Sequence, residues 1–226
     1  MLKAVIFDMD GVLVDSEPVH FKSNQITLKK YAGVDLDYEY YKQFIGSTVA
    51  AMWQIMQKDF HVTDYSWEDL MKKNDEILAE MLRKEGYPEV PGAAELVRKL
   101  HEQGYLLAIA SSSRLEKINY NVTNLGIKDC FQALVSGMDL KRPKPAPDIF
   151  LKAAEKLGVK PEECLVIEDS QNGVKAALAA GMACLGFINP NSGNQDLSAA
   201  DYLFEDFSSV EEGFLRMVHD HHCKEP

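Results

Sequence analysis

The chain alternates short, continuous apolar runs with longer segments in which apolar residues recur at helical spacing. Residues 4–7 are four consecutive apolar residues, which is typical of a strand buried on both faces of a parallel sheet. Similar runs occur later, at Leu106–Ala110, Ala133–Val135, Leu165–Ile167 and Ala183–Phe187. Helical patterns that end close to glycines separate these runs. The alternation predicts an α/β fold with a Rossmann-like, doubly wound parallel sheet.

Residues 16–87 interrupt this alternation, because they show helical periodicity and many charges but no convincing buried strand. We therefore predict a small all-helical cap domain at 16–87, inserted into a core domain formed by 1–15 and 88–226. Its clearest helix begins at Ser66, which Asp69 follows at the spacing of a capping box. Because the insertion follows the first strand, we expect it to lie above the carboxyl edge of the sheet.

One polar residue, Asn74, falls within the apolar stripe of that helix. A buried amide needs a hydrogen-bond partner, so Asn74 is either bonded inside a bundle of four helices or faces a polar cleft. The sequence leaves both alternatives open.

Composition limits the classes of partner that the chain is expected to bind. The 226 residues carry a formal net charge of -11, which argues against nucleic acid as a partner. No apolar stretch is long enough to span a membrane. The four cysteines are scattered and the chain begins directly in a strand, so we expect a cytoplasmic protein. The sequence fixes no oligomeric state and is compatible with a monomer. The C-terminal group of His219, His221, His222 and Cys223 is interpreted as a solvated tail.

Two carboxylates follow the first strand. Asp8 and Asp10 are two residues apart, so on an extended backbone their side chains point the same way. In open parallel sheets, ligands bind outside the carboxyl ends of the strands, and adjacent carboxylates there need a cation or a proton between them. Gly11 lets the chain turn sharply away. Taken alone, this pattern is equally typical of an ordinary turn.

Three further polar segments, around Ser111, Lys144 and Glu168, are candidates for the same site. Ser111 ends a strand-like run and could bind an anion together with the backbone amides behind it, while Ser112 or Ser113 is expected to cap the next helix. Lys144 lies between two prolines, which restrict where it can be. Glu168 and Asp169 end another buried run and repeat the opening pattern.

Carboxylates combined with a fixed lysine suit a phosphate held through magnesium. Mg²⁺ prefers one or two carboxylates together with water and phosphate oxygens, and it would remove the repulsion between Asp8 and an incoming phosphate. Asp8 can then act as a nucleophile that forms an aspartyl-phosphate. Asp10 is placed to protonate the leaving oxygen and later to deprotonate water.

In order and context, these segments are similar to the four motifs of the haloacid dehalogenase superfamily. The insertion and the segments 144–148 and 168–173 resemble its β-phosphoglucomutase-like subgroup. The resemblance implies that Asp8 is the nucleophile and Asp10 the acid and base. It implies that Mg²⁺ is held by Asp8, the Asp10 backbone carbonyl and Asp169, with Glu168 assisting. It also implies that Ser111 and Lys144 hold the phosphate, with Ser112, Ser113 and Arg114 adjoining.

The subgroup contains both phosphatases and mutases, and the cap residues distinguish them. His20 matches a hinge-side histidine that mutases use, and Lys73 with Asn74 resembles the cap segment whose lysine contacts the substrate of a mutase. The loop that begins at Gly46, however, continues into Val49, where the mutase has an arginine for the second phosphate. A bidentate arginine is not readily replaced by a distant lysine.

We therefore predict hydrolysis of a small phosphorylated metabolite, such as a sugar phosphate. The alternative is a β-phosphoglucomutase that interconverts β-glucose 1-phosphate and glucose 6-phosphate. A catalytically silent sensor of phosphorylated ligands is a third interpretation. A sensor would be expected to have lost a motif carboxylate, and this chain keeps all of them.

Overall fold

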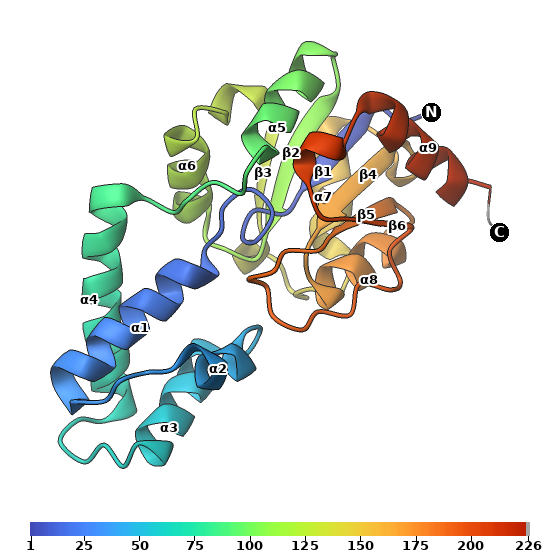
Figure 1. The fold of residues 1–226 in the computed structure, drawn as a ribbon. Coiled ribbons are helices and arrows are strands. Elements are labelled where there is room, and N and C mark those ends of the chain that lie inside the picture. The colour runs from blue at the N-terminus through green and yellow to red at the C-terminus, as the bar shows by residue number, and fades with distance from the viewer. Residues whose placement is uncertain (225–226) are drawn as a thin grey trace. The chain divides into compact units, whose positions relative to one another are not determined.

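The computed structural model describes residues 1–224 and divides the chain into two compact units (Figure 1). An α/β unit contains residues 1–14, 89–190 and the chain from 194 onward, and a helical unit contains residues 15–88 with 191–193. Residues 191–193 were not predicted to join the helical unit. Within that unit, the Asn191 Nδ2 atom donates a hydrogen bond to Asp15 Oδ2 at 2.6 Å.

The α/β unit is built on a six-stranded, fully parallel sheet with the strand order β3-β2-β1-β4-β5-β6. The strands are β1 (Ala4–Phe7), β2 (Leu106–Ser111), β3 (Ala133–Ser136), β4 (Cys164–Glu168), β5 (Ala183–Phe187) and β6 (Tyr202–Phe204). The predicted α/β class and parallel sheet are confirmed. Phe7 aligns with Ile109 of β2 and with Ile167 of β4, so the residues that follow these three meet at one edge.

Helices cover both faces of the sheet: α5 (Ala93–Glu102), α6 (Leu115–Asn124), α7 (Asp148–Leu157), α8 (Gln171–Ala179) and α9 (Glu212–His222). Ala4 and Ile6 share a hydrophobic cluster with residues of α7 and α8. Val5 and Phe7 point to the opposite face and are equally buried. Burial on both faces explains why the strand sequences are apolar without alternation. Short 3-10 turns lie at Lys128–Cys130, Gly137–Asp139, Pro161–Glu163 and Phe207–Ser209.

The helical unit contains α1 (Glu17–Ala32), α2 (Tyr38–Tyr41), a 3-10 turn (Lys42–Phe44), α3 (Val49–Asp59) and α4 (Trp67–Glu85). Its core includes the fully buried side chains of Leu28, Trp53, Met56 and Leu70. The predicted capping box is confirmed, because the Ser66 hydroxyl accepts a hydrogen bond from the Asp69 amide at 3.1 Å and the Asp69 carboxylate accepts from the Ser66 amide.

Two elements at the C-terminal end, β6 and α9, were not predicted. Strand β6 has three residues, of which two are exposed, so it leaves no recognisable apolar run. The interpretation of the C-terminal histidines as a solvated tail is wrong for His219. Its side chain is buried on α9, and its Nε2 atom lies 2.9 Å from the Glu162 carbonyl oxygen.

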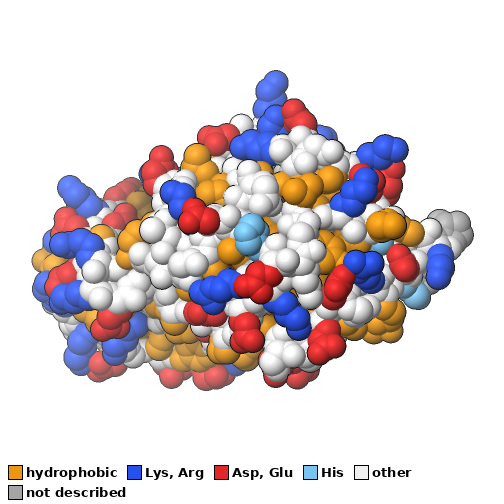
Figure 2. All heavy atoms as spheres, turned by 90° about the horizontal axis from the view of Figure 1, so that it is seen from above, with side chains coloured by type: hydrophobic (Ala, Val, Ile, Leu, Met, Phe, Trp, Pro, Cys, Tyr) orange, Lys and Arg blue, Asp and Glu red, His pale blue; other side chains and the backbone are white. Residues whose placement is uncertain are grey.

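The surface carries charges of both signs. On the face that Figure 2 shows, acidic and basic side chains are interspersed. Within residues 1–224, no helix is both long enough and apolar enough to cross a membrane.

Candidate active site

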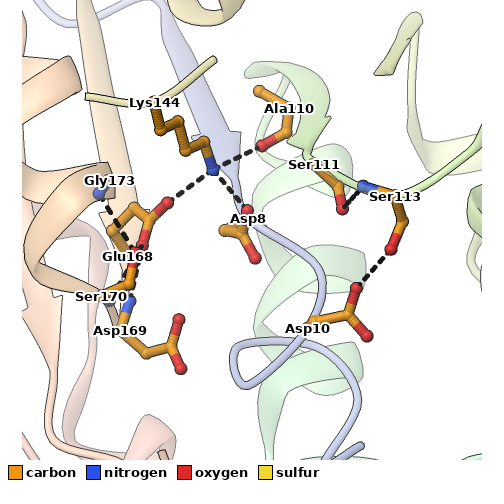
Figure 3. Close-up of polar contacts among 10 residues, drawn as sticks. All are labelled: Asp8, Asp10, Ala110, Ser111, Ser113, Lys144, Glu168, Asp169, Ser170 and Gly173. Atoms are coloured by element: carbon orange, nitrogen blue, oxygen red, sulfur yellow. Dashed lines mark hydrogen bonds and ion pairs between the residues drawn. The ribbon is translucent and has the colours of Figure 1, made fainter. Parts of the chain in front are cut away.

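One lysine joins three strand ends at the carboxyl edge of the sheet (Figure 3). The Lys144 Nζ atom lies 2.5 Å from Asp8 Oδ1, just after β1, and 2.6 Å from Glu168 Oε1, at the end of β4. It also donates to the Ala110 carbonyl oxygen of β2 at 3.0 Å. The structure therefore brings together Asp8, Lys144 and Glu168, which lie far apart in the sequence.

Burial dominates the electrostatics of this cluster, since the side chains of Asp8 and Lys144 are only 10% and 7% exposed. Burial raises the pKa of Asp8 to about 7, although the Lys144 charge opposes this and the Glu168 charge adds to it. Burial alone would lower the pKa of Lys144, but Asp8 and Glu168 together raise it above its usual range. The cluster thus holds more negative charge than one lysine compensates.

The Glu168 carboxylate is fixed by its own turn. Its Oε2 atom accepts hydrogen bonds from the backbone amides of Asp169 and Ser170, both at 3.0 Å, and from the Ser170 hydroxyl at 2.9 Å. A Cβ atom at Gly173 would lie 1.8 Å from Glu168 Cδ. Position 173 therefore has to be glycine, because the carboxylate occupies the space of its side chain. The structure directs Glu168 to Lys144 and to this turn.

Asp169 follows Glu168 and is buried. In Figure 3 its carboxylate is turned to the side on which Asp8 and Asp10 lie. Hard carboxylate oxygens in an electronegative pocket suit a divalent cation such as Mg²⁺. Among residues 1–224, no three His, Cys, Asp or Glu side chains form a metal site by themselves. Mg²⁺ commonly uses one or two carboxylates and completes its coordination with water and phosphate oxygens.

Asp10 is more exposed than Asp8 and has different partners. The Ser113 hydroxyl donates to Asp10 Oδ2 at 2.7 Å, and the Lys117 Nζ atom lies 2.7 Å from Asp10 Oδ1. Lys117 was not predicted as a site residue, because a lysine within a helix pattern is usually a solvated surface charge. The turn that carries Asp10 is held by Asn189, whose side-chain amide donates to the Gly11 carbonyl oxygen at 2.8 Å.

The serine segment before α6 differs from the prediction. The expectation that Ser112 or Ser113 caps the helix is wrong, because Arg114 occupies the N-cap position and its side chain makes no capping bond. Ser113 directs its hydroxyl to Asp10 instead. The buried Ser111 hydroxyl accepts the Ser113 amide at 3.1 Å, which places Ser111 at the end of β2 beside the cluster.

The helical unit has a cavity of about 230 Å³ of its own. It is lined by Glu17, His20, Asn24, Tyr41, Phe44, Gly46, Ser47, Val49, Met52, Asn74, Asp75 and Leu78. Both alternatives for Asn74 hold, because it lines this cavity and its Oδ1 atom accepts from the Thr27 hydroxyl at 3.1 Å. His20 lies beside Tyr87, with 3.4 Å between its Nε2 atom and the Tyr87 hydroxyl.

Lys73 is placed differently from His20, Gly46 and Asn74. Its Nζ atom lies 4.4 Å from the centre of the Tyr31 ring and 5.1 Å from that of Tyr65. These are cation–π distances, and Lys73 is not part of the cavity lining. The structure therefore does not bring Lys73 to the other predicted cap residues.

A parallel sheet with an acidic cluster at its carboxyl edge and an inserted helical unit defines an α/β enzyme of the doubly wound class. The family model for haloacid dehalogenase-like hydrolases matches residues 5–187. The chain belongs to this family and is of the β-phosphoglucomutase-like type, since its structural neighbours include proteins named as β-phosphoglucomutase and CbbY.

Relatives with assigned activities cover most of the chain. Hexitol phosphatase B of Escherichia coli (strain K12) is 32% identical over 84% of this chain and 86% of its own. The phosphorylated carbohydrates phosphatase of Thermotoga maritima is 31% identical over 80% of this chain and 82% of its own.

Solved structures agree with this assignment. A Thermotoga maritima protein assigned as a β-phosphoglucomutase has a TM-score of 0.81 and 28% identity, covering 97% of this chain and 99% of its own. A haloacid dehalogenase family hydrolase of Deinococcus radiodurans, solved with phosphate and sodium, has a TM-score of 0.82 and 26% identity, covering 96% of this chain and 97% of its own.

Proposed function

We propose that this hydrolase cleaves the phosphate monoester of a small phosphorylated metabolite, namely a sugar or sugar-alcohol phosphate. The observation that carries the proposal is the buried Asp8–Lys144–Glu168 cluster at the carboxyl edge of the sheet. A buried carboxylate beside a fixed ammonium can attack a phosphate whose charge that ammonium also neutralises. The two named phosphatases of phosphorylated carbohydrates support the choice of substrate class.

The first step transfers the phosphoryl group to the protein. An Asp8 carboxylate oxygen forms a bond to phosphorus while the bond from phosphorus to the ester oxygen breaks. The carboxyl group of Asp10 gives its proton to the departing oxygen, which leaves as an alcohol. Lys144, Ser111 and the neighbouring backbone amides hold the phosphoryl oxygens during this transfer.

The second step returns Asp8 to its initial state. Asp10, now a carboxylate, takes a proton from water as the water oxygen bonds to phosphorus. The bond between phosphorus and the Asp8 oxygen breaks, and inorganic phosphate leaves. Asp10 is protonated again and ready for the next ester, so the proton balance closes over both steps.

Asp8, Asp169 and the backbone carbonyl of Asp10 would hold Mg²⁺. The bound ion supplies positive charge that offsets the repulsion between Asp8 and the phosphate. In this arrangement Glu168 acts through Lys144, whose ammonium it orients at 2.6 Å.

The cavity of the helical unit, called the cap cavity below, favours hydrolysis over the mutase reaction. Val49 lines it where an arginine would be needed for a second phosphate, and the acidic residues Glu17 and Asp75 line it as well. A bisphosphate intermediate would need a cationic pocket for its second phosphate group. Negative side chains in the lining disfavour that group instead. Water is therefore the favoured acceptor of the phosphoryl group.

The test is a screen of sugar phosphates and sugar-alcohol phosphates in the presence of Mg²⁺, with released phosphate as the readout. We expect release that stops when the metal is chelated and returns when Mg²⁺ is restored. In parallel, β-glucose 1-phosphate is supplied with a trace of glucose 1,6-bisphosphate, and glucose 6-phosphate is measured. Efficient conversion without phosphate release would establish the mutase instead. Ligand binding without any turnover would indicate the sensor.

A further inference from the structure

We infer that Lys117 is a positioning residue, which together with Ser113 holds the Asp10 carboxylate for the proton transfers. The inference rests on the proposed function, in which Asp10 is the acid and base. Each carboxylate oxygen has its own donor: Lys117 Nζ at Oδ1 and Ser113 Oγ at Oδ2, both at 2.7 Å. Two donors at two oxygens fix both the position and the plane of a carboxylate, which one donor cannot do.

The Ser113 hydroxyl comes from a backbone that is itself held on both sides. Its amide donates to Ser111 Oγ at 3.1 Å, and its carbonyl oxygen accepts from Ser136 Oγ at 2.9 Å. Ser136 ends β3, so two neighbouring strands, β2 and β3, fix the loop that presents this donor. The donor is thus preorganised before any substrate binds.

The Lys117 ammonium comes from a helix that is anchored to the same turn. Lys117 and Asn121 are four residues apart on α6 and therefore share one face of the helix. The Asn121 side-chain amide contacts the Met9 sulfur at 3.3 Å, directly beside Asp10 in the chain. The helix face that carries Lys117 is in this way aligned with the Met9–Asp10 segment.

Stability alone does not account for this pair. The side chains of Lys117 and Asp10 are 30% and 28% exposed, and ion pairs that water can reach contribute little to folding. A lysine that stabilises little but fixes the orientation of the proposed acid and base is expected to act on the rate. Orientation matters because proton transfer requires the acid within hydrogen-bond reach of the reacting oxygen.

The experiment compares two esters that differ in their need for a proton. A sugar-alcohol phosphate has a poor leaving group and needs protonation by Asp10, whereas p-nitrophenyl phosphate has a good leaving group that does not. Lys117→Met is expected to lower kcat/KM for the sugar-alcohol phosphate by about 10- to 100-fold, within the range of general acid catalysis. For p-nitrophenyl phosphate the loss of kcat/KM is expected to stay below about threefold, since kcat/KM reports the transfer to Asp8, in which this leaving group needs no proton.

Three controls accompany this variant. Lys117→Arg keeps a cationic donor and is expected to restore most of kcat/KM on the sugar-alcohol phosphate. Lys152→Met removes a lysine from an ion pair with Glu155 on α7 and is expected to change neither ester. Ser113→Ala removes the other donor and is expected to show the same selective loss as Lys117→Met. Thermal unfolding verifies that each variant is folded.

The outcomes separate the two hypotheses. If Lys117→Met loses activity equally on both esters, or loses none, the positioning role is wrong while the proposed function stands. If the unchanged protein hydrolyses neither ester with Mg²⁺ present, the proposed function fails and the role of Lys117 with it.

Discussion

The two units of the molecule treat their buried polar groups differently. In the α/β unit, the oxygens of Asp8 and Glu168 that face Lys144 have partners at 2.5 and 2.6 Å, and the remaining Glu168 oxygen accepts from three donors. In the helical unit, Asn24 Oδ1 and Trp53 Nε1 are buried and, within residues 1–224, have no hydrogen-bond partner. Asn24 also lines the cap cavity.

This difference indicates that the two units have different roles, with the chemistry in the α/β unit and ligand selection in the helical unit. A charge network held by this many hydrogen bonds is rigid and suits one fixed chemistry, because its dipoles need little rearrangement during the reaction. An incompletely paired polar cavity costs stability, but it leaves acceptors that a ligand hydroxyl can satisfy. We therefore expect changes in the α/β cluster to act on the chemical step, and changes in the helical unit to act on stability and ligand choice.

The largest effect is expected at the nucleophile. Asp8→Asn removes the attacking oxygen, so Mg²⁺-dependent phosphate release should fall by at least about 10³-fold. The measurement is phosphate release from the best substrate of the screen. Asp139→Asn, an exposed residue in a 3-10 turn of the same unit, is the control and should keep its activity. Retained activity in Asp8→Asn would show that another group attacks the phosphate.

The next largest effect is expected for Gly173→Ala, which removes the space that the Glu168 carboxylate occupies. In Gly173→Ala the added Cβ would meet the Glu168 carboxylate at 1.8 Å, so the carboxylate has to move and its bonds to Lys144 and Ser170 are strained. We expect a loss of about 1–3 kcal/mol in the free energy of unfolding, typical of overpacking, together with a large loss of activity.

A matched control exists on another helix. Gly213 lies in the first turn of α9, as Gly173 does in α8, and a Cβ atom there would have no neighbour within 4 Å. Gly213→Ala is therefore expected to raise the free energy of unfolding by about 0.5–1 kcal/mol, the helix preference of alanine over glycine. Urea unfolding measures both variants. Equal effects would mean that the space at Gly173 is not occupied as the structure shows.

The contrast between these glycines also shows what a sequence can reveal. Asp8, Lys144 and Glu168 could be placed at one edge in advance, because strand-like runs precede both acids and parallel strands end together. Gly173 and Lys117 could not, since their roles depend on where α8 and α6 are anchored. In the sequence, Gly173 resembles any helical glycine and Lys117 resembles a surface charge. Only the packed structure distinguishes Gly173 from Gly213 and Lys117 from Lys152.

The fold shows the same limit. Strands β1 to β5 could be predicted because burial on both faces leaves continuous apolar runs. Strand β6 is three residues long and two of them are exposed, so its pairing with β5 decides its structure and its composition does not. Residues 191–193 are polar or glycine, and nothing in their pattern indicates which unit they join.

A smaller effect is expected at the buried hydrogen bond of the helical unit. Thr27→Val removes the hydroxyl whose single proton is shared between the Ser23 carbonyl oxygen at 2.8 Å and Asn74 Oδ1 at 3.1 Å, and it leaves the buried Asn74 oxygen without this donor. We expect a loss of about 1 kcal/mol in the free energy of unfolding, at the lower end of such costs because Asn74 also borders the cavity.

Thr123→Val is the control for Thr27. Both hydroxyls bond the carbonyl oxygen four residues earlier in a helix, but Thr123 is exposed and, among residues 1–224, contacts no buried amide as Thr27 does. Its substitution should change the free energy of unfolding by less than about 0.5 kcal/mol. A loss as large in Thr123→Val as in Thr27→Val would show that the bond to Asn74 contributes nothing.

The smallest effect concerns the charge of the cap cavity and depends on pH. Burial raises the pKa of Asp75 above its usual value of 3.8. The charged form is therefore disfavoured in the folded state, so this residue lowers stability at neutral pH, where it is ionised in both states. The penalty fades as the pH falls through the raised pKa and is absent below the unfolded value, where both states are protonated.

Asp75→Asn should accordingly raise the free energy of unfolding at pH 7 by at most about 0.5 kcal/mol, because solvent reaches much of this side chain and screens its charge. The difference from the unchanged protein should vanish at about pH 2.5, where the carboxyl group is protonated in both states. Urea unfolding at both pH values provides the test, with Glu76→Gln as the control for removing one charge from the same helix outside the cavity lining. A stability gain that persists at the lower pH would show that the substitution acts through packing, and would remove the evidence for a charge penalty in this cavity.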